Sequence, residues 1–440
     1  MAMEARTAFQ NARSESRYKD APVAGVSADD HADLYRQLWH ECAGLTIKVP
    51  HLGDRVFYFP QGHIEQIKEC LNDEDDTSIP NYHLPSKILC KVVDVELKAF
   101  PDSDEVFAEI GLLPDSEEGW GSISRSVPQK IPANSFRKVL TTSDASSHGG
   151  CCLPKAHVEK TFPPLGVQDP SEDQASQFLV AKDLVGATWY FQHIYRGNPK
   201  RHILANGWNK FACEKKLKAG DTCIFMRGLG PNEIFVGVHR AVRMQKRSTD
   251  LTGPAMRRGI LVNAALAIDT RCPFTVIYHP RMCASAFVVS YDKVMEALKV
   301  NYSPEMGFEM LVDGGEDPEM KRFSGIITAK KDIDPARWPR SEWRCLKVQW
   351  DVTSSGQLLP LRVSPWDILP LGLDVSHMQL SSSVDRKRSM PFKHMIHYNP
   401  FSRTNENSES GGLQSQGLTL SVVNPGSSSC QDETILAEDR

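Results

Sequence analysis

The chain has 440 residues, of which 40% are hydrophobic and 24% are charged, and its formal net charge is −4 at pH 7. This composition is typical of globular proteins, and no run approaches the ~18 apolar residues of a membrane span, so we expect no membrane-spanning segment. The first 20 residues lack the apolar stretch of a secretory signal, so we expect the eleven cysteines to be mostly buried thiols.

Charge is distributed unevenly along the chain. Residues 136–247 carry 17 Lys and Arg against 9 Asp and Glu, whereas the rest of the chain carries 34 against 46. A basic segment between acidic flanks is typical of nucleic-acid binding, although a solvated surface without a partner is an equally good interpretation of charge alone.

Near the N-terminus, hydrophobic spacing predicts one helix followed by strands. The helix is capped by Asp33 and ended by Gly44, and the next strand covers residues 55–60, where a proline stops it. Residues 86–99 and 105–114 are typical of two paired strands with a Pro-Asp-Ser-Asp turn between them.

The basic segment predicts a small all-β unit. Residues 178–183 and 188–196 have the alternation of one hairpin, and residues 222–228 and 233–241 have that of another. Closely spaced antiparallel strands of this kind favour a small barrel or sandwich.

After the basic segment, the pattern changes to a mixture of helices and strands. We expect a helix over 257–268, strands at 274–280 and 286–290, and a second helix over 291–300. From residue 321 onward a compact all-β pattern returns.

The stretch HIYRGNPKRH at residues 193–202 is the strongest candidate binding element. Gly197 and Pro199 should end the preceding strand, which leaves Arg196 and Arg201 at the rim of the barrel on a constrained turn. A guanidinium held there suits the O6 and N7 acceptors of guanine, whereas Lys200 suits a phosphate. The alternative is a solvated turn with no partner.

The stretch RKVLTTSDASSHGG at residues 137–150 offers a second set of donors. Its hydroxyl groups suit phosphates, and the two glycines after His148 let the backbone approach a ligand closely. A Ser/Asp/His catalytic triad is the rival interpretation, but no nucleophile signature accompanies it. The adjacent Cys151 and Cys152 are poorly arranged as two ligands of one zinc ion, so we expect no metal site.

Two features of the C-terminal half each have two interpretations. Gly259, Val262 and Ala265 form a helix face that can pack on a partner helix or within its own domain. A group of tryptophans could form a cage for a methylated cation, but more often such residues belong to the core of a small barrel. These tryptophans are Trp338, Trp343, Trp350 and Trp366.

Ordered blocks from about Asp33 to Ile368 resemble the plant auxin response factors. They include LYRQLWHECAG, LTTSDASSHGG, HIYRGNPKRHIL, FTVIYHPR, RWPRSEWRCLKVQWD and RVSPWDI. The resemblance implies a mainly β fold with some α. A B3 seven-stranded open pseudobarrel is inserted in a split α+β dimerisation domain, and a small Tudor-like β-barrel follows.

The implied domains follow in chain order. They are a disordered N-terminus 1–30, dimerisation domain first part 31–120, linker 121–135, B3 DNA-binding domain 136–245, dimerisation domain second part 246–320, Tudor-like ancillary domain 321–370 and a disordered Ser-rich tail 371–440. Nothing after residue 371 resembles the family's C-terminal Phox-and-Bem-like domain, so we expect a divergent member that lacks it.

The resemblance also implies roles for individual residues. Base-reading roles fall on His148, Gly149, Arg196, Pro199 and Arg201. DNA-backbone roles fall on Lys138, Ser143, Asn198, Lys200 and Asn206. The dimer interface falls on Gly259, Val262 and Ala265. No catalytic residue, cofactor or metal is implied.

This chain departs from the family pattern mainly beside the base-reading positions. Asn198 stands where the family usually has Gln, Lys200 where it has Arg, and Asn206 where it has Thr. Val262 is bulkier than the usual Ala. The expected base readers are retained, so the departures bear on phosphate contacts and on dimerisation.

We therefore predict a nuclear, non-enzymatic transcription factor that binds TGTC-containing auxin response elements in double-stranded DNA. The expected form is a homodimer, or a heterodimer with other auxin response factors, that represses or competes at auxin-responsive promoters. No membrane, small-molecule substrate or cofactor is expected. The alternative function is a reader of methylated peptides in chromatin through the Trp-rich barrel.

Overall fold

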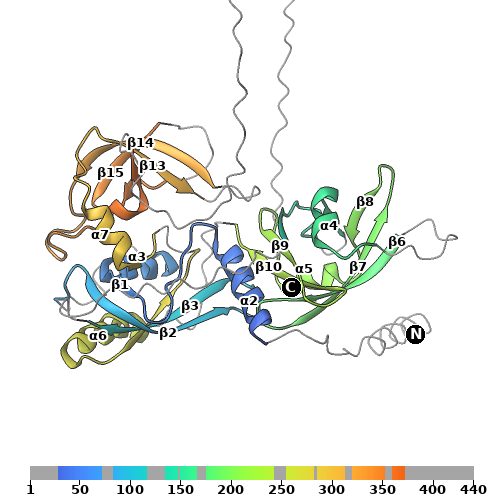
Figure 1. Ribbon diagram of the computed structural model, residues 1–440, viewed down its shortest axis with the longest axis horizontal. Helices are drawn as coiled ribbons and strands as arrows, with labels where there is room; N and C mark the ends of the chain where they lie inside the picture. Colours follow the sequence, from blue (N-terminus) through green and yellow to red (C-terminus); the bar gives the residue numbers. More distant parts are fainter. Residues whose placement is uncertain are drawn as a thin grey trace, which may run out of the picture. The chain divides into compact units, whose positions relative to one another are not determined.

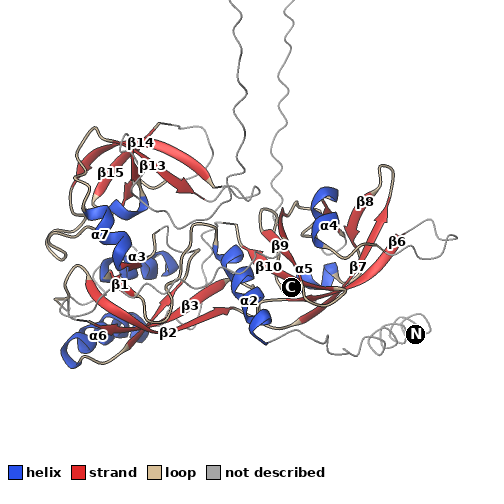
Figure 2. Ribbon diagram, in the orientation of Figure 1, coloured by secondary structure: helices blue, strands red, loops and turns tan. Residues whose placement is uncertain are grey.

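The computed structural model describes residues 28–71, 83–115, 134–146, 149–165, 175–241, 254–281, 285–312, 320–351 and 359–371. These residues form three β-sheets with helices packed against them (Figures 1 and 2). The predicted mainly β fold is confirmed. None of the helices in the described ranges has both the length and the apolar character needed to cross a membrane.

The first sheet is assembled from two distant parts of the chain. Its strands lie in the order β11-β3-β2-β1-β12, and all neighbours are antiparallel. They are β1 (Arg55–Tyr58), β2 (Ile88–Ala99), β3 (Val106–Pro114), β11 (Phe274–Tyr278) and β12 (Val288–Ser290). The chain therefore leaves this sheet after β3, builds the seven-stranded sheet, and returns with β11. The predicted pairing of residues 86–99 with 105–114 is confirmed.

Four helices accompany the first sheet. They are α2 (Ala28–Ala43), α3 (Pro60–Leu71), α6 (Pro254–Thr270) and α7 (Tyr291–Leu298). The predicted cap at Asp33 is wrong, because α2 begins at Ala28 and Asp33 lies inside it. Gly44 ends the helix as predicted, with a φ of 121° that a side chain would make unfavourable. Helix α3 was not predicted. Its first residue is Pro60. Proline is favoured at the first position of a helix because an N–H there has no acceptor inside the helix, so proline loses no hydrogen bond by lacking one.

The core of the first sheet contains most of the predicted tryptophan cluster. Trp338, Trp343 and Trp366 are buried there, and the Trp366 ring stacks on Phe59 with 4.5 Å between the ring centres. Only Trp350 packs on the small third sheet. The interpretation as core is confirmed for Trp338, Trp343 and Trp366, although their core is shared with the first sheet, whereas Trp350 is half-buried. The three buried rings cannot serve as the open cage that the methyl-reader alternative requires.

The second sheet has seven strands in the order β4-β9-β10-β6-β7-β8-β5, with β10 and β6 parallel and the other neighbours antiparallel. Its elements are β4 (Ser135–Val139), β5 (Cys151–Leu153), α4 (Lys155–Thr161), β6 (Ala175–Lys182), β7 (Thr188–Arg196), β8 (Arg201–Leu204), α5 (Trp208–Glu214), β9 (Thr222–Arg227) and β10 (Glu233–His239). Both predicted hairpins, β6–β7 and β9–β10, are confirmed.

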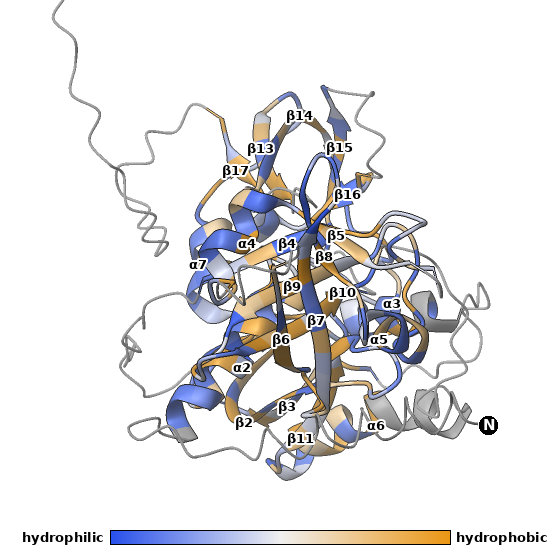
Figure 3. Ribbon diagram, turned by 90° about the vertical axis from the view of Figure 1, so that its right-hand side faces the viewer, coloured by the Kyte–Doolittle hydropathy of each residue, from blue (hydrophilic) through white to orange (hydrophobic). Residues whose placement is uncertain are grey.

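Strands β9 and β10 are mostly hydrophobic (Figure 3), and nearly all of their alternating residues are buried. One face lies in the core of the seven-stranded sheet with Phe225 and Val236. On the other face, Ile224, Met226 and Phe235 belong to the core of the first sheet. A strand that is buried on both faces reads as a continuous hydrophobic run, which explains the sequence of β9.

The third sheet has the order β16-β15-β14-β13-β17. Its elements are β13 (Gly307–Val312), β14 (Lys321–Lys330), β15 (Leu346–Trp350), β16 (Arg362–Val363), the 3₁₀ helix η3 (Pro365–Asp367) and β17 (Leu369–Pro370). The predicted boundary at residue 321 is too late, because β13 already pairs with β14 and β17. Tyr302 and Phe308, which lie before that boundary, are buried in the core of this sheet.

Candidate nucleic-acid interface

The β7–β8 hairpin places its basic residues at one tip. Arg196 and Arg201 are the last cross-strand pair, and residues 197–200 form the turn, where Gly197 has a φ of 98°. All six residues of the tip are exposed. Directly opposed residues of two strands project from the same face of the sheet, so the two guanidinium groups share one side. No ion pair links Arg196, Lys200 or Arg201 to a carboxylate within the described ranges.

The root of this hairpin is held by a buried pair of histidines. His193 Nε2 lies 2.9 Å from His202 Nδ1, and His193 Nδ1 lies 3.2 Å from the side-chain nitrogen of Gln177. Burial lowers the pKa of His193 to about 4, with a further contribution from His202, whose own pKa is also lowered by burial. Both rings are therefore neutral at pH 7, and the hairpin root adds no charge of its own to the cationic tip.

The loop between β4 and β5 is organised by a buried carboxylate, Asp144. Its Oδ2 accepts hydrogen bonds from the Thr141 amide (3.0 Å) and hydroxyl (2.8 Å), and its Oδ1 accepts one from the Cys152 amide (3.2 Å). Lys138 Nζ lies 3.1 Å from Oδ2. Burial opposes ionisation of Asp144, but these four contacts outweigh it and lower the pKa of the carboxyl group. The indole of Trp208 also donates to the Asp144 carbonyl oxygen at 2.7 Å.

Two glycines allow close packing here: Gly149 packs the loop against itself, and Gly150 brings it against β8 of the β7–β8 hairpin. A Cβ on Gly149 would lie 2.6 Å from the Ser143 carbonyl oxygen, and one on Gly150 would lie 2.7 Å from that of Leu204 in β8. The following strand β5 then pairs with β8, with Cys151 opposite Leu204. The two predicted binding segments are therefore neighbours at one edge of the seven-stranded sheet. We call the Thr141–Gly149 segment and the 196–201 tip the two arms.

The comparisons with known proteins agree with this arrangement. Residues 136–242 match the family described as "B3 DNA binding domain", and residues 287–372 match "Auxin response factor ancillary domain". "Auxin response factor 2" of Arabidopsis thaliana is 47% identical over 79% of this chain and 40% of its own length. The chain belongs to the auxin response factor family.

Other auxin response factors give similar values. "Auxin response factor 2B" of Solanum lycopersicum is 46% identical over 80% of this chain and 42% of its own length. "Auxin response factor 23" of Oryza sativa subsp. japonica is 47% identical over 77% of this chain and 40% of its own length. The chain thus spans less than half the length of these relatives. A solved structure, "Arabidopsis FUS3-DNA complex", aligns with 24% of this chain and 96% of that chain at 26% identity, with a TM-score of 0.21.

The other predicted DNA contacts of this auxin response factor have varied surroundings. Asn198, Pro199 and Lys200 lie on the exposed turn of the hairpin tip, and His148 lies outside the described residues. Ser143 is exposed, with its hydroxyl 2.9 Å from that of Thr141. Asn206 donates to the side-chain oxygen of Gln192 at 2.7 Å. Their roles on DNA stay predictions.

Lys138 and Asp144 are the two residues whose arrangement differs most from the sequence interpretation. The predicted phosphate ligand Lys138 is mostly buried, with 17% of its side chain exposed, and it already pairs with Asp144. The rival triad interpretation would aim Asp144 at His148, but the Asp144 carboxylate oxygens accept hydrogen bonds from Thr141 and from the Cys152 amide. Thr141 and Asp144 have the Thr-x-x-Asp spacing of a capping box, in which each side chain accepts a hydrogen bond from the other residue's amide, and this spacing could have indicated the structural role.

The predicted dimer helix α6 turns one face toward the first sheet. Leu261, Ala264 and Ala267 are buried in its core. Ala265 packs at the margin of that core, so it lies on the side of the helix rather than opposite the sheet. Val262 is half-buried, and Leu266 on the outer side is 54% exposed. Leu266 is an exposed apolar residue that the sequence interpretation left out, and helical spacing places it beside Val262.

Proposed function

We propose that this auxin response factor is a nuclear transcription factor that reads TGTC-containing sites in double-stranded DNA with its two arms. The single observation that carries the proposal is the paired, exposed and uncompensated Arg196 and Arg201 at the hairpin tip. Two like charges directly opposite each other are unfavourable in the free protein. An anionic partner removes that repulsion and gains two charge-assisted hydrogen-bond donors.

The constraint on the tip favours base reading over a nonspecific electrostatic patch. The ladder of β7 with β8 continues into β5, and the neutral histidine pair fixes the hairpin root. A guanidinium presented from such a frame can align its two N–H groups with O6 and N7 of one guanine, which discriminates by ~1–3 kcal/mol. Lys200 has no planar fork, so we assign it to a phosphate.

We further propose that the protein binds as a dimer to inverted pairs of sites, because protein two-fold symmetry is mirrored in the DNA. The outer face of α6, with Val262 and Leu266 and the predicted Gly259, is the proposed interface. An exposed leucine beside a half-buried valine is an apolar surface that a second copy of the helix would cover. The expected repression or competition at auxin-responsive promoters stays a prediction that a promoter–reporter assay tests.

The base-reading assignment is tested by comparing Arg201→Ala with Lys200→Ala. Fluorescence anisotropy is measured on a TGTC duplex and on a duplex with one altered base, at several salt concentrations. Arg201→Ala should cost ~1–3 kcal/mol on the TGTC duplex and reduce the preference between the two duplexes. Lys200→Ala should weaken both equally and reduce the salt slope by about one unit. An equal loss on both duplexes for Arg201→Ala would refute base reading by that residue.

The dimer assignment is tested by Val262→Arg, with Asn263→Arg as the control on the exposed flank of the same helix. Sedimentation should show that Val262→Arg shifts the protein toward monomer, and the advantage of paired over single sites should disappear. Affinity for a single site should not change. An unchanged dimer would exclude this face of α6 as the interface.

A further inference from the structure

Two amide side chains form a hydrogen-bonded pair behind the hairpin tip. Asn206 Nδ2 donates to Gln192 Oε1 at 2.7 Å. Gln192 is half-buried and Asn206 is exposed, so the pair lies at the surface. Gln192 has no role in the proposed function, and Asn206 has only the backbone role that the family resemblance implies. We call these two residues the amide pair.

The amide pair lies on the same face of the hairpin as the two arginines. Side chains alternate along a strand, so Gln192 in β7 projects from the same side as Arg196, four residues further on. A rise of ~3.4 Å per residue places Gln192 about 13 Å behind the tip. Between them on this face lie the cross-strand pair Ile194 and Ile203, and a Cβ on Gly150 would lie 2.8 Å from Ile203. The amide pair therefore lies close to the first arm as well as behind the hairpin tip.

Backbone contacts between the two strands fix the amide pair. The Gln192 amide donates to the Asn206 carbonyl oxygen at 2.9 Å, and the Ala205 amide donates to the Gln192 carbonyl oxygen at 2.8 Å. Two residues thus face one residue of β7, as in a β-bulge. The next residue, Gly207, has a φ of 89°, and a Cβ there would overlap the Tyr190 carbonyl oxygen. Asn206 is therefore held against β7 on both sides.

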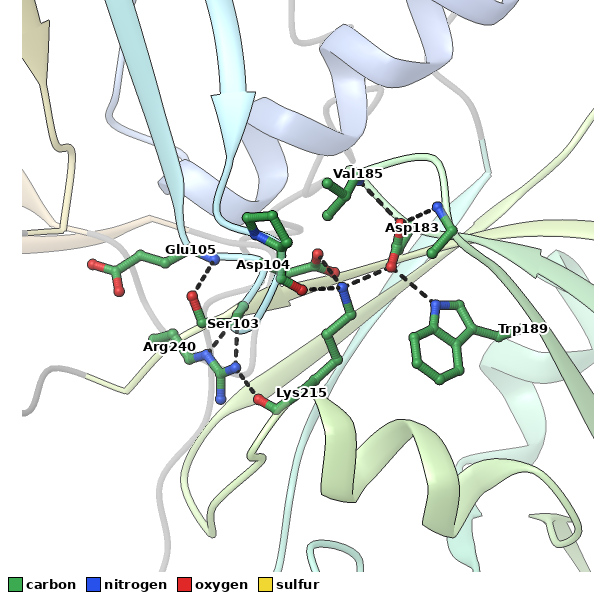
Figure 4. A network of polar contacts seen from close by, with 10 residues as sticks. Ser103, Asp104, Glu105, Asp183, Val185, Trp189, Lys215 and Arg240 are labelled. Atoms are coloured by element: carbon green, nitrogen blue, oxygen red, sulfur yellow. Dashed lines mark hydrogen bonds and ion pairs between the residues drawn. The ribbon is translucent and has the colours of Figure 1, made fainter. Parts of the chain in front are cut away.

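The other end of β7 is anchored by buried polar contacts (Figure 4). The Trp189 indole donates to Asp183 Oδ2 at 2.9 Å, and the same oxygen lies 2.7 Å from Lys215 Nζ. Gln192 lies between this anchor and the buried histidine pair at the hairpin root. A site on a strand held in this way is more precise than a site on a loop, so the separation of Gln192 from the tip is set by the sheet.

The hydrogen bond within the amide pair leaves the donors of Gln192 available. Its Oε1 accepts from Asn206, whereas its Nε2 donates to no protein atom within the part of the chain that the structure describes. The amide nitrogen of glutamine carries two protons, and both can be offered to another acceptor. A glutamine that is already fixed through its oxygen also loses less rotamer freedom when it binds.

We infer that Gln192 donates from Nε2 to a phosphate at the rim of the major groove that the hairpin tip enters, and that Asn206 is a positioning residue for this contact. The inference rests on the proposed function, because it requires the tip to bind in the groove. The major groove is ~8.5 Å deep, so a residue about 13 Å behind a tip at the groove floor lies at the level of the phosphates. Gln192 is therefore too far back to read a base, and Asn206 acts through it rather than on DNA.

The first test is Gln192→Glu, measured by anisotropy in the full chain. The variant keeps the size of the side chain and the acceptor for Asn206, but it presents an oxygen in place of the donor. Kd should rise about tenfold or more on the TGTC duplex, because a hydrogen bond to a charged group is lost. It should rise by the same factor on the duplex with one altered base, because a phosphate contact carries no sequence information.

The matched control for Gln192→Glu is Thr188→Glu. Thr188 is exposed on the same face of β7, four residues further from the tip. That separation is about 13 Å and exceeds the Debye length of ~8 Å at physiological salt. Thr188→Glu should therefore bind both duplexes like the wild type, and a loss seen in Gln192→Glu alone is local.

The role of Asn206 is tested by a double-mutant cycle on the TGTC duplex. Asn206→Ala alone should raise Kd several-fold, whereas on the Gln192→Ala background it should have almost no further effect. Additive effects would show that Asn206 contacts DNA itself and would overturn its positioning role. Neither single variant should change the slope of log Kd against log salt concentration, because a neutral amide releases no counterion.

Thermal melting shows whether each variant is folded. If Gln192→Glu does not fold, Gln192→Lys decides, because an ammonium group beside a phosphate should make the salt slope steeper by about one unit. A folded Gln192→Glu variant with the wild-type Kd, or a Gln192→Lys variant with the wild-type slope, overturns the inference alone. If the wild-type protein does not distinguish the TGTC duplex from the altered one, the proposed function fails instead.

Discussion

Removal of the Asp144 carboxylate tests whether this residue organises the first arm. In Asp144→Ala the amides of Thr141 and Cys152 both lose a charged acceptor, at 3.0 and 3.2 Å in the native protein. The exposed Thr141 hydroxyl can turn to water, and we leave out any additional loss from the mostly buried Lys138 ammonium, so we count only the two amides. Hydrogen bonds to a charged partner contribute ~1.5–3 kcal/mol each, which predicts a loss of about 3–6 kcal/mol in the free energy of unfolding.

The loss is measured from the shift of the urea midpoint, with Ser143→Ala as the control on the exposed side of the same turn. The control should change the free energy of unfolding by less than ~0.5 kcal/mol. Asp144→Ala should also weaken DNA binding, because the arm must then be ordered during association. The preference for guanine that we assign to Arg201 should remain. A change below ~1 kcal/mol in Asp144→Ala would show that the arm is held by other contacts.

Three further results are expected from the contacts described. Gly207→Ala should lose more than ~3 kcal/mol of stability or fail to fold, because Gly207 has a φ of 89° and its Cβ would overlap the Tyr190 carbonyl oxygen; circular dichroism and thermal melting measure this. Gly62→Ala should lower the free energy of unfolding in urea by ~1–3 kcal/mol, because its Cβ would lie 2.8 Å from Cε2 of the fully buried Trp343 ring. A urea midpoint equal to that of the wild type would contradict this packing. Between pH 7 and pH 5 His193 becomes protonated in the unfolded chain but stays neutral in the folded chain, where its pKa is about 4. The free energy of unfolding should therefore fall by about 2 kcal/mol over this range because of His193. In His193→Gln the fall in the free energy of unfolding should be smaller by that amount, and an equal fall in the variant and the wild type would refute this assignment.

Several elements of the fold could be predicted from local pattern because their chemistry is local. Both hairpins of the seven-stranded sheet have alternating strands and clear turn residues. Strand β5 has three residues and β8 has four, which is too short for a periodic signal, and both were missed. The sequence also could not place β13, because membership of a sheet depends on which strand pairs with it rather than on its own residues.

The candidate site was predictable in part for the same reason. Gly197 and Pro199 locate the tip of the hairpin, and the pairing of Arg196 with Arg201 follows once the turn is known. The pairing of Lys138 with Asp144 could not be inferred, because it requires the strand β4 to run beside the turn that follows it. The inner and outer faces of α6 were similarly hidden, since small and apolar residues occur all around that helix.

The origin of the first sheet's strands has a consequence for how the chain folds. Val56 in β1 pairs with Ser290 in β12, and Ile110 in β3 pairs with Val276 in β11, so that sheet cannot be completed until the intervening chain has been made. The seven-stranded sheet needs only residues from Ser135 to His239. Closing a loop costs less when its ends are already close, so we expect the inserted sheet to fold first. During synthesis, α2 and the strands β1–β3 would then keep an exposed apolar surface and unpaired strand edges until β11 is made, and the chain would be most prone to aggregation in that interval.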